Sequence, residues 1–267
     1  MWKKLWLEIA GAHRFVVPAH PGMTSEAELS ALPRAAQAYM RFFGVVPGTP
    51  KHWSFELAWH GRFRLGPDRH WFPIEAVQYN TRDPIARFFH MRARMAHVLP
   101  LLARDTYLDG RGHMRAKLAG MIPVVDETGL EYDLGELVTW LDDAVLFAPT
   151  MLLGPTTSWR DAGDRAFELE LTDADRSVSA RVQVGDDGAP LDFETEDRFV
   201  GDPADRQHRP IRARWTTPIE GWQQGPLPVG ARAIWHLASG DFAYGEWTLD
   251  AGRVAYDVLP PAAAYAA

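Results

Sequence analysis

The first strong pattern of hydrophobic residues predicts a helix over residues 25–43. Ser25 and Glu28 have the spacing of a capping box, and apolar residues then recur at helical spacing. Gly44 provides a stop signal at the other end. Pro33 lies inside the segment and lacks a backbone N–H donor, so the helix can be broken at that residue.

A second helical stripe covers Leu134–Phe147. Its apolar side chains recur at helical spacing, and Pro149 follows where the helix should end. Glu136, Thr139 and Asp143 lie on the opposite side of the helix from this stripe. The pattern therefore predicts one face packed against the rest of the protein and one face in water.

Outside these helices, hydrophobic and polar residues alternate one by one, as in strands with one buried face. The alternation is clearest over residues 53–60, 167–171 and 178–184. Dipeptides typical of turns, such as Asp109-Gly110 and Asp187-Gly188, separate such runs at short intervals. Short connections favour antiparallel hairpins, because parallel strands need long crossovers.

The alternating pattern continues to residue 257 without a linker or an internal repeat. We therefore expect a single β-rich ligand-binding domain over residues 25–257, mainly β in class. Its fold would be a curved antiparallel open-barrel-like sheet of about ten strands, with the two helices packed on it. Residues 1–24 would form an N-terminal extension, and residues 258–267 a flexible tail.

The N-terminal segment resembles a signal peptide only briefly. Its apolar run is short, Glu8 interrupts it, and no cleavage site follows. Because no stretch reaches the length of a membrane span, we expect a cytoplasmic protein that begins with an ordinary short helix. Contact with a membrane would be peripheral at most. The sequence leaves the oligomeric state open.

Composition and motifs exclude several classes of function. The chain has 28 basic and 35 acidic residues, a net charge of −7, which disfavours binding to nucleic acid. It has no cysteine, so thiol nucleophiles and cysteine-based metal sites are excluded. The ten histidines lack metal-binding spacing, and no nucleophile elbow, dinucleotide fingerprint or P-loop occurs. We therefore predict no metal and no cofactor.

Asp105 is the most informative candidate for chemistry. If Gly110-Arg111 is a two-residue hairpin loop, Asp105 pairs with Ala116 and lies on an otherwise apolar face. A carboxylate there must find a partner or raise its pKa. It could be a catalytic acid or base, or a structural anchor paired with His97, Arg198 or backbone amides.

Two further groups of charged residues allow alternative interpretations. Asp142 and Asp143 could belong to a solvated helix face, or one of them could oppose Asp105 and share acid–base chemistry with it. The second group is a stripe of basic residues that could bind an anionic headgroup or form a solvated convex face. The stripe comprises Arg87, Arg92, Arg94, Arg104, Arg115 and Lys117.

Aromatic and methionine residues are numerous enough to line a cavity, although they could equally form an ordinary core. With one cation, they are our candidate ligand-binding residues: Trp59, Trp71, Phe89, Met91, Tyr107, Met114, Trp140 and Arg198. The candidate catalytic residues are Asp105 and Asp143.

An ordered series of short motifs resembles a bacterial family of unknown function over residues 32–256. The matching pieces are Leu32-Pro33 through Tyr39 and Gly44, Ala103–Asp105 into Asp109–Gly112, Trp140–Asp143 through Pro149-Thr150, Asp197–Phe199, Trp215, Pro226–Pro228 and Trp235. The resemblance implies an open β-barrel similar to the lipoprotein carriers, which hold acyl chains.

Three functions follow as hypotheses. The first is binding of a hydrophobic, lipid-like or polycyclic small molecule in the curved sheet. The second is a cofactor-independent isomerase, cyclase or hydrolase that uses carboxylate or histidine acid–base chemistry in that cavity. The third is a protein-interaction module that uses the basic face.

Overall fold

The computed structural model describes residues 1–11, 21–95, 99–201, 207, 209–223 and 225–259. His97 and most of the predicted tail, residues 260–267, lie outside the described residues. The helices are α1 (Trp2–Gly11), α2 (Glu26–Ser30), α3 (Arg34–Phe42) and α4 (Leu130–Phe147), with 3-10 turns η1 (Pro149–Leu152) and η2 (Ala251–Arg253).

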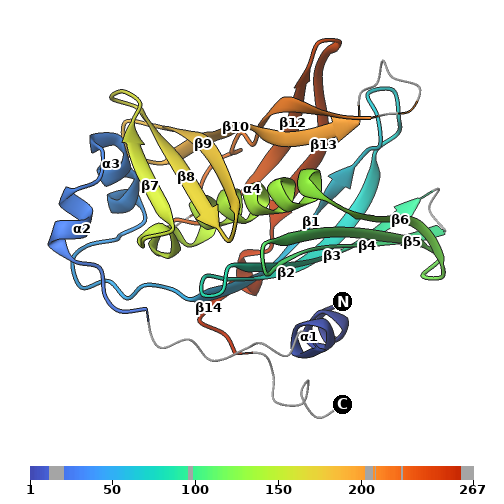
Figure 1. Ribbon diagram of the computed structural model, residues 1–267, viewed down its shortest axis with the longest axis horizontal. Coiled ribbons are helices and arrows are strands. Elements are labelled where there is room, and N and C mark those ends of the chain that lie inside the picture. The colour runs from blue at the N-terminus through green and yellow to red at the C-terminus, as the bar shows by residue number, and fades with distance from the viewer. Residues whose placement is uncertain (12–20, 96–98, 202–206, 208, 224, 260–267) are drawn as a thin grey trace.

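One strongly curled antiparallel sheet forms the body of the protein, as predicted (Figure 1). The described residues contain fourteen strands rather than about ten. They are β1 (Ser54–Phe63), β2 (Phe72–Thr81), β3 (Ala86–Met95), β4 (Leu99–Leu108), β5 (Arg111–Leu118), β6 (Ile122–Thr128), β7 (Thr157–Asp161), β8 (Ala166–Asp173), β9 (Arg176–Val184), β10 (Pro190–Gly201), β11 (Pro210–Thr216), β12 (Gly230–Leu237), β13 (Gly240–Leu249) and β14 (Ala255–Tyr256).

The strand order makes the sheet an open half-barrel. It runs β6-β5-β4-β3-β2-β1-β13-β12-β11-β10-β9-β8-β7, and β14 pairs with β1. The first six strands and the last seven are therefore two meanders joined where β1 pairs with β13. The edge strands β6 and β7 are not paired with each other, so the curled sheet stays open on one side.

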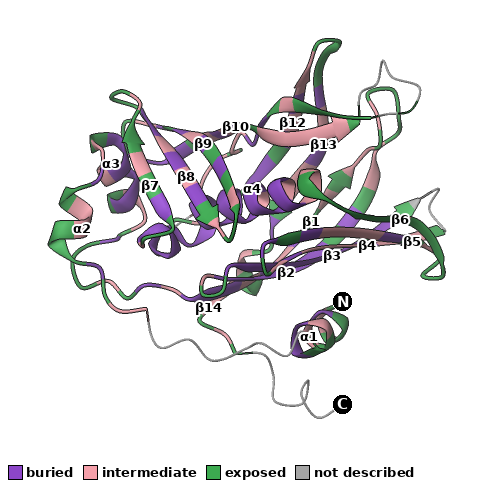
Figure 2. Cartoon of the chain, in the orientation of Figure 1, coloured by how far each residue is buried: buried purple, intermediate pink, exposed green. Residues whose placement is uncertain are grey.

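Helix α4 lies inside the concavity and contacts strands of both meanders, most extensively β5 and β10 (Figure 1). Our prediction of a solvated polar face on this helix is therefore wrong. Glu136, Asp142 and Asp143 are all buried, and Figure 2 shows most of α4 in the colour of buried residues. Sheet on two sides of the helix buries most of its central turns, and only Gly135 and Thr139 there stay partly exposed.

The predicted helix over 25–43 is present and is broken at Pro33 into α2 and α3. The capping box at its start is formed: the Ser25 hydroxyl accepts from the Glu28 backbone N–H, and the Ser25 backbone N–H donates to the Glu28 carboxylate. Tyr39 of α3 is fully buried and donates its hydroxyl to the carbonyl of Val145 at 2.8 Å. This last bond holds α3 against the end of α4.

The predicted short N-terminal helix is also present, as α1. It packs on the convex face of the sheet, on the opposite side from α4 (Figure 1). Leu5 and Ile9 are fully buried there against Val77, Tyr79 and Phe88. None of the helices in the described residues has the length and apolar character needed to cross a membrane.

The β4–β5 hairpin differs from the predicted register. Its loop is Asp109-Gly110 rather than Gly110-Arg111, and both loop residues have positive φ, at 53° and 74°. Type I′ hairpin turns require positive φ at both positions, which Asp-Gly favours. Asp105 consequently pairs with Met114 instead of Ala116. The shift is two residues, so each side chain keeps its predicted face.

Candidate functional site

A cavity of about 730 Å³ lies between α4 and the concave face of the sheet. Strands from both halves of the sheet line it, together with one side of α4. Most of its wall is aromatic or apolar: Trp59, Phe63, Phe89, Met91, Met114, Trp215, Trp235, Phe242, Tyr244 and Trp247. The curvature of the sheet brings these residues together from six strands that span most of the chain.

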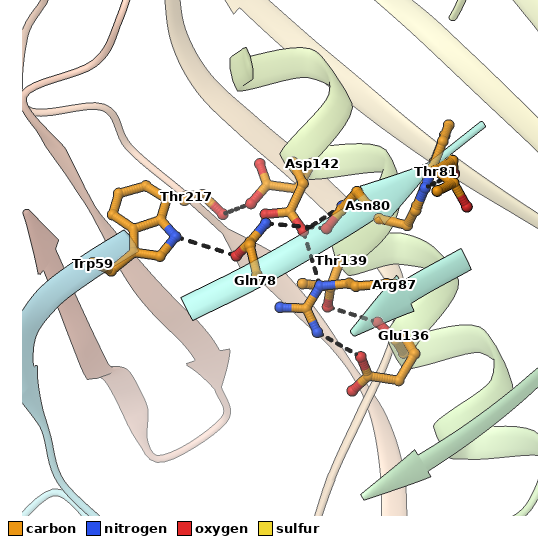
Figure 3. Close-up of polar contacts among 12 residues, drawn as sticks. Trp59, Gln78, Asn80, Thr81, Arg87, Glu136, Thr139, Asp142 and Thr217 are labelled. Atoms are coloured by element: carbon orange, nitrogen blue, oxygen red, sulfur yellow. Dashed lines mark hydrogen bonds and ion pairs between the residues drawn. The ribbon is translucent and has the colours of Figure 1, made fainter. Parts of the chain in front are cut away.

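The alternation of side chains along β3 brings a charged residue to this wall. Arg87, Phe89 and Met91 are two residues apart, so all three point to the concave face. The Arg87 side chain is only 5% exposed. Its Nε donates to Asp143 Oδ2 and its NH1 donates to Glu136 Oε2, each at 2.8 Å (Figure 3). One guanidinium thus links two turns of α4 to the sheet.

A chain of hydrogen bonds runs from this ion pair to an aromatic ring of the wall (Figure 3). Asn80 donates to Asp143 Oδ2 at 3.1 Å, and Gln78 donates to Asn80 Oδ1 at 3.3 Å. Trp59 in turn donates its indole N–H to Gln78 Oε1 at 3.1 Å. Each bond fixes the orientation of the next side chain, so the Trp59 ring is held in place before any ligand arrives.

Two other carboxyl groups at this end of the cavity are incompletely paired. Asp142 Oδ2 accepts a hydrogen bond from the Thr217 hydroxyl at 3.3 Å, but its buried Oδ1 has no partner in the described structure. Asp105 is partly accessible, yet its Oδ1 is buried and has no partner there either. Both residues line the cavity. The cavity therefore presents two carboxyl oxygens that lack donors.

Burial raises the pKa of each of these acids. It raises the pKa of Asp105 to about 7, with a further contribution from Glu136 and against the opposing charges of Arg87 and Arg198. Burial and then the neighbouring Asp143 raise the pKa of Asp142 well above its usual range. Burial also raises the pKa of Glu136, although Arg87 opposes it. Protons can therefore reside on this cluster near neutral pH.

Among the described residues, no group of three or more histidine, aspartate or glutamate side chains is arranged to hold a metal ion. That the protein holds no metal ion stays a prediction.

Comparison with known proteins identifies the family. A model for DUF6544, a family of unknown function, matches residues 22–247. The chain belongs to this family. The resemblance to a family of unknown function, seen in the sequence, is thereby confirmed, and the sheet is the open half-barrel expected from it. No curated protein matches the chain.

One solved structure similar to this DUF6544 member is a crystal structure from Vibrio parahaemolyticus, provisionally described as an outer membrane lipoprotein-sorting protein domain. The sequences are 10% identical, and the TM-score is 0.42. The alignment covers 85% of this chain and 93% of that chain.

The structure of this DUF6544 member brings most of the candidate residues to one cavity. Those that line it are Trp59, Phe89, Met91, Asp105, Met114, Asp143 and Arg198. The Arg198 guanidinium lies over the rings of Trp215 and Trp235, at 4.3 and 5.7 Å from their centres. The ligand-binding and catalytic roles of all these residues remain predictions.

Three other candidates lie away from the cavity wall. Trp71 contacts the guanidinium groups of Arg62 and Arg64, at 4.8 and 4.7 Å from its ring centre. Tyr107 is buried and donates its hydroxyl to Asp173 at 2.8 Å. Trp140 is fully buried and donates its indole N–H to the carbonyl of Thr81 at 2.8 Å. The contacts of Tyr107 and Trp140 are those of packed structural residues.

Four residues of the site were not among the predicted site residues: Arg87, Glu136, Gln78 and Asn80. The prediction that Arg87 belongs to the basic stripe of the convex face is wrong, because Arg87 shares the concave face with Phe89. The two-residue period of β3 already contained this information. The remaining members of the stripe do lie on the convex side: Arg92, Arg94 and Lys117 are exposed, while Arg104 and Arg115 contact α1.

Proposed function

We propose that this protein binds a hydrophobic small molecule, lipid-like or polycyclic, in the cavity of the half-barrel. The observation that supports the proposal is the cavity itself, about 730 Å³ in volume and walled mostly by aromatic and other apolar residues. Sites for small molecules typically have this size and this apolar lining, with a few polar groups at fixed positions.

The polar end of the cavity supports an oriented mode of binding. Arg87, Glu136 and Asp143 are held in place by mutual ion pairs, and Asn80 and Gln78 extend this network to Trp59. A wall that is fixed in advance reduces the ordering cost of binding. A ligand would therefore place its apolar body against the aromatic rings and its polar group toward α4.

The proposal can be tested with N-phenyl-1-naphthylamine, a polycyclic probe whose fluorescence rises in apolar surroundings. Ala233 lines the cavity from β12, so Ala233→Phe should fill part of it and raise the Kd of the probe about tenfold or more. Ala243→Phe, on the other face of the neighbouring strand β13, is the matched control and should leave the Kd within about twofold. Equal saturable binding by both variants, or none by the unmodified protein, would refute the proposal.

A second candidate function is cofactor-independent acid–base catalysis. It is favoured by Asp105, a carboxyl group in an apolar cavity whose pKa is raised to about 7, near the working range of a general acid or base. Asp105→Asn separates the two functions. A carrier should keep its affinity for the probe within a few-fold, whereas an enzyme should lose about a hundredfold or more of its turnover.

A further inference from the structure

The charged groups around the cavity are predominantly acidic. Six carboxyl groups and three guanidinium groups line it: Asp105, Glu127, Glu131, Glu136, Asp142 and Asp143 against Arg64, Arg87 and Arg198. Glutamate and aspartate are rarely buried without partners, because the charged form loses its hydration. Glu127 and Glu131 reach solvent, so the acids that call for a specific explanation are the other four.

Two of the three guanidinium groups already have partners within the protein. Arg87 donates to both Glu136 and Asp143. Arg64 donates to the backbone carbonyls of Ala243 and Pro67, at 2.6 and 2.9 Å. Neither side chain needs an anionic ligand to complete its contacts.

The third guanidinium, Arg198, faces more than one carboxyl group. Its positive charge opposes the rise in the pKa of Asp105, of Glu136 and of Asp142. Arg87 also acts on Asp105 and Glu136, so two cations serve three acids, and for Asp142 the cation is Arg198. An anionic group placed here would add a further negative charge to this set, at a cost that the low polarity of the cavity increases.

Two of the carboxyl groups, in contrast, each have an oxygen that receives no hydrogen bond in the described structure. Asp142 is 6% exposed and lines the cavity, and its Oδ1 is buried without a hydrogen-bond partner in the described structure. Asp105 Oδ1 is also buried without a hydrogen-bond partner in the described structure. Unsatisfied buried acceptors cost free energy, and a native protein retains them where a ligand or water supplies the donor.

We propose that the ligand is a cationic amphiphile, an apolar molecule that ends in a protonated amine. This rests on the proposed function, because it specifies the polar group of the molecule bound in the same cavity. The ammonium group would donate to Asp142 Oδ1, with Asp105 as a second acidic group in the same cavity, and its positive charge would balance the excess of acid. The apolar body would lie against the aromatic wall, whose ring faces also attract cations.

Calorimetric titration with three molecules of equal chain length tests the proposal: dodecylamine, dodecanol and dodecanoate, each kept below its aggregation concentration at pH 7.5. We expect dodecylamine to bind about tenfold or more tightly than dodecanol, and dodecanoate to bind most weakly. Dodecanoate binding as tightly as dodecylamine, or dodecanol binding equally well, would overturn it.

Two substitutions locate the effect. Asp142→Asn keeps an acceptor oxygen for the Thr217 hydroxyl but cannot ionise to pair with a bound ammonium group, so it should reduce the preference for dodecylamine over dodecanol about fivefold. Asp105→Asn should reduce it similarly. Asp126→Asn, which changes an exposed carboxylate on the edge strand β6, is the matched control and should leave the preference unchanged.

The outcomes distinguish this inference from the proposed function. If the naphthylamine probe binds in the cavity and the three headgroups bind equally, only the inference fails. If neither the probe nor any of the three molecules binds, the proposed function fails with it. An unchanged preference in both Asp142→Asn and Asp105→Asn would also overturn the inference, even where dodecylamine binds most tightly.

Discussion

Each side of the sheet has a cluster of charged side chains. Basic groups outnumber carboxyl groups in the convex cluster, and carboxyl groups outnumber basic groups in the concave one. On the convex face, one carboxylate, Glu8 of α1, contacts His90, Arg104 and Arg115 at 2.6, 3.0 and 2.8 Å. On the concave face, carboxyl groups outnumber guanidinium groups two to one. Glu8 has both oxygens paired, whereas Asp105 and Asp142 each have an oxygen without a donor.

This difference separates a structural contact from an incomplete site. Burial works against ionisation of Glu8, but the hydrogen bond with His90 and the charges of Arg104 and Arg115 outweigh it, and the pKa of Glu8 is lowered. The pKa of Asp105 and that of Asp142 are raised instead. Partners on the protein satisfy the first cluster, while the second retains capacity for hydrogen bonds from a ligand.

The largest effect should come from removing the cation of the concave cluster. Arg87→Met would leave Glu136 and Asp143 buried without their main partner, which typically costs about 3–5 kcal/mol of stability. Urea denaturation monitored by tryptophan fluorescence measures this free energy.

Arg160→Met is the control for that measurement. Arg160 pairs with Glu170 on the surface, and both side chains are largely exposed, so the loss should stay below about 1 kcal/mol. If the two variants were equally stable, Arg87 would not hold a desolvated ion pair, and the contrast between the two faces would disappear.

The next effect concerns how stability depends on pH. The charged or titratable groups that act on Asp105 are Arg87 of β3, Tyr132 and Glu136 of α4, and Arg198 of β10. With a pKa raised to about 7 in the folded protein, Asp105 binds more protons folded than unfolded between pH 4 and 7. Its contribution to stability therefore falls as pH rises through this range, by up to about 1.4 kcal/mol per unit.

Asp105→Asn should remove this slope, so the variant should gain stability relative to the unmodified protein from pH 5 to pH 7. Denaturation at the two pH values measures the change. Asp126→Asn should show no such gain, because the pKa of Asp126 is lowered and this carboxylate is ionised throughout the range. A parallel pH profile for Asp105→Asn and the unmodified protein would contradict the raised pKa.

Local periodicity predicted which side chains share a face, but not what covers each face. The two-residue period placed Asp105 on the apolar face of β4, and a register error of two residues left that assignment intact. The same period would have placed Arg87 beside Phe89. The alternation of residues along each strand thus indicates to which face of the sheet the side chains of the site point.

The surroundings of α4 could not be derived in this way. Its helical period separates Glu136 and Asp143 from the apolar stripe, which in an ordinary surface helix means contact with water. Here β5 and β10, which are far apart in the chain, close on the helix from different sides. Burial of the polar face depends on the curvature of the whole sheet, a long-range property that no single segment encodes.

The smallest effect should come from the convex cluster. Glu8→Gln would weaken three contacts at once, but these are partly exposed to water, so we expect a loss of about 1 kcal/mol in the docking of α1. Because the pKa of Glu8 is lowered in the folded protein, its contribution is present above the unfolded pKa and is lost as pH falls through the folded value. Hydrogen exchange of the α1 amides at neutral pH should therefore accelerate several-fold in Glu8→Gln, and the gap between variant and unmodified protein should close in acid.

Glu75→Gln is the control for this measurement. Glu75 is an exposed carboxylate of β2 on the convex face, so this variant should exchange like the unmodified protein. Equal protection of α1 in Glu8→Gln and Glu75→Gln at neutral pH would show that the buried side chains of Leu5 and Ile9, rather than the ion pairs, hold the helix to the sheet.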